Sequence, residues 1–231
     1  MANTPAIRNN AVNANNEFVF RPGSPGGGNI FPTWAECYTA ARSYPGMSML
    51  RVDTSLNDAV VAGGTWDMSG IQVGGFNRIS ATGPADTLQL GEGCVLENME
   101  TFVSPMRVRN MSSSPSIVVS GQHSIVAHVG VIFEAPGGPM IEVQDGAQLI
   151  LTMLGGSQLT GGSPVVELAG SSTLVVQLFS GSMASFNTVT GTAALVSVSI
   201  FGSGSSFDSL QTGLTTTPAI NLITQAEYEG Y

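Results

Sequence analysis

The chain has 231 residues, of which 42% are hydrophobic and 10% charged, and its 29 glycines are typical of folded, turn-rich β-structure. Its net charge is −9, its seven basic residues are all Arg, and none follows Arg109, so we exclude nucleic-acid binding, which needs clustered Lys or Arg. No run of 18 apolar residues occurs, and the N-terminus has no apolar signal core. We therefore expect no membrane span and no conventional secretion.

Residues 1–17 form a polar segment rich in Asn and Ala, without hydrophobic periodicity. We predict an extended N-terminal arm that becomes ordered when a partner holds it. Its candidate partner contacts are its one Arg and most of its Asn side chains: Arg8, Asn9, Asn10, Asn13, Asn15 and Asn16.

Residues 18–70 are predicted to form a compact α+β cap with one helix near Thr33–Arg42. Thr33 occupies an N-cap position, and Glu36 follows three residues later as in a capping box. The glycine-rich loop 22–28 is predicted to be a structural turn, since it lacks the Gly-Lys-Ser/Thr ending of a phosphate loop. The predicted cap core contains three large aromatic side chains: Trp34, Tyr38 and Trp66.

Both cysteines lie among apolar neighbours in different segments. We favour two buried free thiols over a disulfide, because Cys37 and Cys94 show no spacing typical of a disulfide framework or of a metal site.

From residue 71 to residue 210 the sequence predicts strand after strand. Four stretches begin with a glycine and continue as a short β-type apolar run, and these glycines are 25, 24 and 21 residues apart: Gly121, Gly146, Gly170 and Gly191. A fixed period of this size is typical of stacked structural repeats. We therefore predict a mainly β protein containing a short parallel β-solenoid, or β-helix. Residues 211–231 are predicted to be a polar C-terminal tail with one candidate strand at Ala219–Ile223.

Several of these runs are apolar at consecutive positions, including Ile117–Val119, Leu149–Leu151 and Leu174–Val176. A strand that is apolar on both faces is buried on both faces. We therefore expect coils of other chains to cover the outer face, and we predict a homotrimer. The predicted trimer or solenoid core contains Val118, Leu149, Leu151, Leu174, Val176 and Leu195.

The sequence offers little for catalysis or metal binding. His123 and His128 are five residues apart on a predicted strand and should face opposite sides. Glu142 and Asp145, three apart, should do the same, which does not suit the paired carboxylates of a glycosidase. We therefore expect no enzymatic activity, no cofactor and no metal site.

One part of the chain resembles a module found at the start of bacteriophage virion proteins, where a small cap precedes a trimeric β-helix. The resemblance is carried by four short motifs: Phe18-Val-Phe-Arg-Pro-Gly, Gly28-Asn-Ile-Phe-Pro-Thr-Trp34-Ala35, Leu50-Arg-Val-Asp53 and Ala62-Gly-Gly-Thr-Trp-Asp-Met68. It transfers no catalytic residue.

The resemblance implies a virion surface protein that is made in the host cytoplasm. We expect a capsid decoration protein (cement or head-spike type), a trimer that binds the major capsid protein or another virion protein. The alternative is a short tail fibre or spike that binds host surface glycan.

Overall fold

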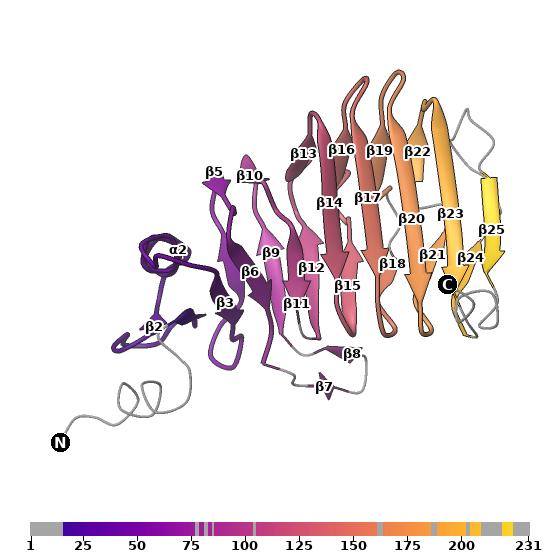
Figure 1. Cartoon of the computed structure of the whole chain (residues 1–231). Helices are drawn as coiled ribbons and strands as arrows, with labels where there is room; N and C mark the ends of the chain where they lie inside the picture. Colours follow the sequence, from indigo (N-terminus) through magenta and orange to yellow (C-terminus); the bar gives the residue numbers. More distant parts are fainter. Residues whose placement is uncertain are drawn as a thin grey trace.

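A computed structural model describes residues 16–76, 79–80, 83–84, 86–103, 105–160, 164–185, 189–201, 204–208 and 219–223. It is a mainly β structure, a parallel β-solenoid of about five turns, which confirms the predicted fold class. The coils stack side by side along one axis, from the indigo strands beside the helix to the yellow strands at the other end (Figure 1).

Sheet A is the broadest side of the solenoid and consists of ten parallel strands. Its strands in spatial order are β2 (Ile30–Phe31), β1 (Glu17–Phe20), β3 (Ser48–Val52), β6 (Ile71–Gly74), β11 (Thr101–Val103), β14 (Gln122–Ala127), β17 (Gln148–Met153), β20 (Thr173–Phe179), β23 (Leu195–Phe201) and β25 (Ala219–Ile223).

Two further sides complete the cross-section. Sheet B contains β24 (Ser206–Asp208), β21 (Met183–Ser185), β18 (Gln158–Thr160), β15 (Val131–Glu134), β12 (Met106–Asn110), β9 (Thr87–Leu90) and β4 (Ala59–Val61). The third side contains the sheet β13 (Ile117–Val119), β16 (Ile141–Val143), β19 (Val166–Leu168) and β22 (Val189–Gly191), together with the pair β10 (Cys94–Glu97) and β5 (Gly64–Asp67).

The chain visits sheet A, sheet B and the third side in turn, so each coil contributes one strand to each side. Gln148 pairs with Gln122 in the coil before it and with Thr173 in the coil after it, 26 and 25 residues away. This register confirms the predicted repeat. A short antiparallel hairpin, β7 (Ile79–Ser80) with β8 (Gly83–Pro84), interrupts an early coil and projects from the shaft beneath β12 and β15 in the view of Figure 1.

The interior is filled by the alternate side chains of each strand. In β17 and β20 every second residue is buried and the residues between them are partly exposed. Four predicted core residues point inward and are fully buried: Leu149, Leu151, Leu174 and Val176. Burying each such side chain contributes about 1.5–3 kcal/mol.

The two other predicted core residues lie outside this interior. Val118 is the middle residue of β13 and points outward, and Leu195 is 45% exposed at the start of β23. The solenoid-core assignment was therefore wrong for both, because three consecutive apolar residues do not reveal which of them face inward. Whether either residue packs between chains stays a prediction.

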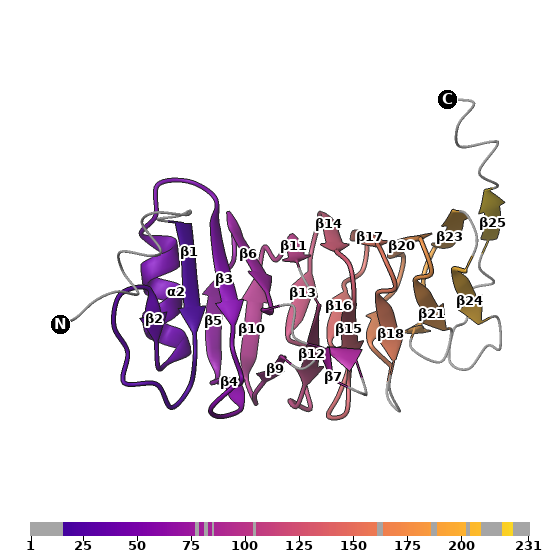
Figure 2. The same cartoon turned by 90° about the horizontal axis from the view of Figure 1, so that it is seen from below.

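A helix lies beside the first strands, at the indigo end of the shaft (Figure 2). Helix α2 spans Trp34–Arg42, and Thr33 is its N-cap, accepting a hydrogen bond from the Glu36 amide, as predicted. Strands β1, β2 and β3 belong to sheet A and β4 belongs to sheet B. The sheets therefore continue across residue 70, where the predicted 18–70 and 71–210 regions meet.

Both cysteines are buried and free, as predicted. Burial raises the pKa of the Cys37 thiol far above its usual range and that of Cys94 to about 12.

Candidate functional site

Of the predicted arm, residues 1–17, the structure describes Asn16 and Glu17, and Glu17 is the first residue of β1. Asn16 donates a side-chain hydrogen bond to the Met47 carbonyl at 3.4 Å, and the Met47 side chain is 58% exposed. The other candidate contacts, from Arg8 to Asn15, lie outside the described residues.

The structure brings the three predicted aromatic residues together beside the helix. Trp34 and Trp66 meet edge to face at 6.2 Å between ring centroids, and Tyr38 meets Trp66 at 5.1 Å. Phe20 of β1 extends the cluster with an edge-to-face contact to Trp34 at 5.8 Å. Such pairs add about 0.5–1.5 kcal/mol each beyond their buried area, so the cluster fixes the helix to the first coil.

Asp67, at the end of β5, joins the helix to two coils through its carboxylate. It accepts hydrogen bonds from Ser69 Oγ at 2.6 Å and Asn98 Nδ2 at 2.9 Å, and it forms an ion pair with Arg42 at 2.9 Å. These hydrogen bonds, that from Ser69 foremost, lower the pKa of Asp67 to about 2. The C-terminal end of α2 is therefore attached to the solenoid by this ion pair as well as by aromatic packing.

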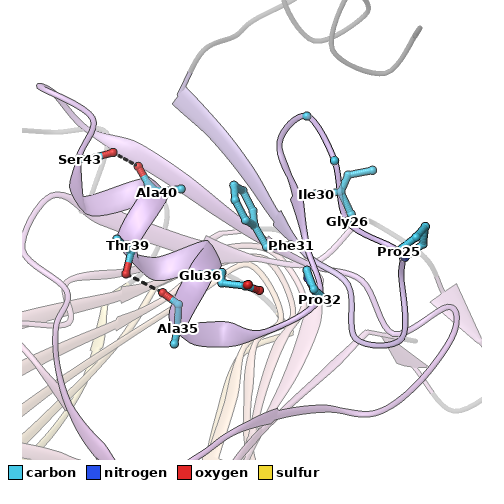
Figure 3. Close-up of a pocket in the computed structure, with 12 residues that line it drawn as sticks. Pro25, Gly26, Ile30, Phe31, Pro32, Ala35, Glu36, Thr39, Ala40 and Ser43 are labelled. Atoms are coloured by element: carbon cyan, nitrogen blue, oxygen red, sulfur yellow. Dashed lines mark hydrogen bonds between the residues drawn. The ribbon is translucent and has the colours of Figure 1, made fainter. Parts of the chain in front are cut away.

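An open groove of about 720 Å³ lies between the glycine-rich loop and the outer side of α2 (Figure 3). The helix contributes Ala35, Glu36, Thr39, Ala40 and Ser43 to it. The facing wall is formed by the loop and β2 through Pro25, Gly26, Gly27, Gly28, Ile30, Phe31 and Pro32. Apart from Glu36 its lining is uncharged, so it suits a largely apolar segment better than an ion.

The outer face of sheet B carries charges. Arg107 forms an ion pair with Glu134 of the next coil, and Arg109 pairs with the same carboxylate at 2.9 Å. The register places Arg109 directly beside Glu134, so this network links β12 to β15.

The third side is acidic. Glu142 of β16 and Glu167 of β19 are register partners on neighbouring strands, so their backbones lie one strand spacing apart, about 4.8 Å, and two like charges leave the sheet side by side. The sequence reasoning missed this pair, although their 25-residue separation matches the repeat. Asp145 lies in the following turn, where Oδ1 accepts hydrogen bonds from the amide and hydroxyl of Ser171. These bonds, that from the amide first, lower the pKa of Asp145.

The outer face of sheet A differs from both. Strands β11, β14, β17, β20 and β23 contain no Asp, Glu, Lys or Arg. Ile150 and Val175 are neighbours on this face, and Thr152 Oγ1 donates to Gln177 Oε1 at 3.0 Å. Along its edge Phe179 and Phe201 stack in parallel at 4.1 Å between ring centroids. Charged residues return only in the first strands, where Arg51 pairs with Glu17 at 3.6 Å.

The histidines do not share a site. His123 Nε2 lies 2.7 Å from the Met99 carbonyl, on the row that continues into buried Leu149. His128 follows the end of β14, where its amide donates to the Phe102 carbonyl. Within the described ranges, no three His, Cys, Asp or Glu side chains cluster as metal ligands.

Comparison of the chain with protein-family models, with curated proteins and with solved structures gives no match. Among the residues placed by the structure, no helix is long and apolar enough to cross a membrane.

Proposed function

We propose that this chain is a structural protein of a bacteriophage virion surface: a homotrimeric capsid decoration protein bound to the major capsid protein or another virion protein. The supporting observation is a packed solenoid whose broadest side, sheet A, is uncharged from β11 to β23, while its other two sides carry charges. A continuous parallel ladder makes a stiff shaft, and an uncharged broad side suits self-association. The role needs no catalytic group.

Attachment to the capsid takes place at the helix end. The 720 Å³ groove opens there, and Met47 and Val60 are 58% and 48% exposed in the same region. The polar arm also joins the solenoid there, because Asn16 directly precedes β1. The arm is polar and its only charged side chains are Arg8 and Glu17, so it offers mainly neutral hydrogen-bonding groups to a partner, and arm and groove together form the proposed capsid-binding end.

The test is a comparison of the full chain with a variant that lacks residues 1–17. Each is mixed with virions or capsids free of this protein and sedimented. The full chain should co-sediment. The shortened chain should stay in solution while keeping the same circular dichroism spectrum and the same oligomeric mass. Full co-sedimentation of the shortened chain would refute attachment through the arm.

A short tail fibre or spike that binds host glycan is the second candidate. It is favoured by the Phe179–Phe201 stack, because parallel aromatic rings on an outer face can contact the apolar faces of sugar rings. Binding of the purified protein to defined host glycans on an array, abolished in Phe179→Ala, would rank this function above the first.

A further inference from the structure

We infer that the outer face of sheet A, from β11 to β23, is the surface through which copies of this chain associate, and that it faces the three-fold axis. The inference rests on the proposed homotrimer and adds which side of the solenoid forms the contact. The occupant of this face is therefore a second copy of the same chain.

The first argument is electrostatic. Around a rotation axis, the side that faces the axis meets copies of itself, so the same residues converge from all three chains. Like charges that converge while losing water repel strongly. Inward-facing Glu142 and Glu167 would place six carboxylates at the axis, and sheet B would bring in Arg107 and Arg109 together with Glu134. Sheet A brings in no formal charge between β11 and β23.

The second argument is the chemistry of the face. Ile150 and Val175 are partly exposed side by side near its middle, and the stacked phenylalanines lie along one edge. At the opposite end of the strands Leu195 is 45% exposed. Protein interfaces are depleted of charged residues at their centres, and this face likewise has an uncharged centre with its aromatic pair along one edge.

The third argument is size. The five strands from β11 to β23 lie about 4.8 Å apart, and the longer ones extend about 20 Å, which gives roughly 500 Å² of flat area per chain. The relief of the side chains increases this figure towards the roughly 800 Å² per partner that standard interfaces bury. The neighbouring sides are built from strands of three to five residues and offer narrower faces.

Single cysteines test the inference directly. Val175→Cys lies on sheet A, Glu167→Cys on the third side and Gln158→Cys on sheet B. The native thiols are buried, so they add little background. Each purified variant is treated with mild oxidant and with a short bis-maleimide reagent, then run on a denaturing gel. We expect a cross-linked pair of chains for Val175→Cys and none for the two controls.

A charge placed on each face provides the second measurement. Val175→Asp should raise the concentration at which the trimer dissociates at least about 100-fold, because three carboxylates converge without counter-charges. Val95→Asp makes the same substitution at an outward position of β10 on the third side, beside Thr65, and should leave dissociation unchanged. Added salt should partly restore association of Val175→Asp.

The outcomes separate this inference from the proposed function. A trimer that cross-links through Glu167→Cys or Gln158→Cys, but not through Val175→Cys, would overturn the assignment of the face and leave the homotrimer intact. A wild-type chain that stays monomeric would overturn both. A monomer whose glycan binding is lost in Val175→Asp would assign sheet A to a glycan instead and would equally overturn the inference.

Discussion

Asn110 is a buried polar residue whose replacement gives a sharp test of the structure. It ends β12, is 0% exposed and holds the turn that leads to β13. Its carboxamide Nδ2 contacts three backbone carbonyls, and its Oδ1 accepts two hydrogen bonds. The carbonyls are those of Ser114 at 3.0 Å, Gly138 at 3.1 Å and Pro139 at 2.6 Å, and the two donors are the Ser112 amide and Ser116 Oγ, each at 3.0 Å.

The expected cost of Asn110→Ala follows from these contacts. The amide has two hydrogens and accepts two bonds, so four hydrogen bonds are lost at about 1 kcal/mol each. Their partners are buried or half-buried, so we expect a loss of about 4 kcal/mol of unfolding free energy. Asn110→Asp keeps the shape but directs a carboxylate oxygen at the three carbonyls. At pH 7 it should therefore destabilise at least as much as Asn110→Ala, and less as the pH falls towards 4, because protonation restores one donor.

The assay is chemical denaturation at a fixed chain concentration, since association adds to apparent stability. Asn57→Ala, at an exposed Asn, is the control and should change stability by less than about 0.5 kcal/mol. The structure would be refuted if Asn110→Ala lowered the unfolding free energy by less than 1 kcal/mol, or if Asn110→Asp were as stable as the wild type at pH 7. Either result would mean that this side chain faces water.

Three further predictions concern the core, the helix attachment and the close approach of coils. Leu151→Asp places an unpaired charge at a fully buried position and should prevent folding, with loss of the oligomer on a sizing column, whereas an unchanged elution volume would refute the register. Asp67→Asn should remove a step of acid destabilisation between about pH 4 and pH 2. The ionised Asp67 stabilises the fold above the pKa it has in the unfolded chain, and this stabilisation is lost as the pH falls through its folded pKa of about 2. An unchanged dependence of stability on acid pH would contradict this. Gly74→Ala should cost several kcal/mol in thermal denaturation, because its Cβ would overlap the Val103 carbonyl, while Gly121→Ala meets no atom within 4 Å and should be tolerated; equal effects would contradict the coil spacing.

The sequence predicted the architecture of this protein because a solenoid repeats its own signals. The intervals between leading glycines lie within one residue of the coil lengths, and Gly146 and Gly170 both adopt positive φ in the turns where a repeat begins. The helix was also predicted correctly, because the capping pair of Thr33 and Glu36 is a local sequence signal. Both features depend on short-range geometry that a sequence displays directly.

Register within the coils was less accessible to sequence reasoning. Side-chain alternation along each strand makes Val118 face outward and Leu149 face inward. Both residues have apolar neighbours in the sequence, so the sequence pattern does not distinguish them. The pairing of Glu142 with Glu167 arises only when two coils are aligned at the observed register. The uncharged face of sheet A emerges in the same way: the glycine-headed runs show that strands repeat, but which residues of each strand face outward appears only when the coils are aligned.

The mass of the purified protein in solution, measured by native mass spectrometry from micromolar to nanomolar concentration, is the most direct test of the account. We predict one species of about 71 kDa, three times the 23.8 kDa chain, that persists on dilution and is favoured modestly by salt because each chain carries a charge of −9. A folded 23.8 kDa monomer at these concentrations would contradict the homotrimer and, with it, the proposed role on the virion surface.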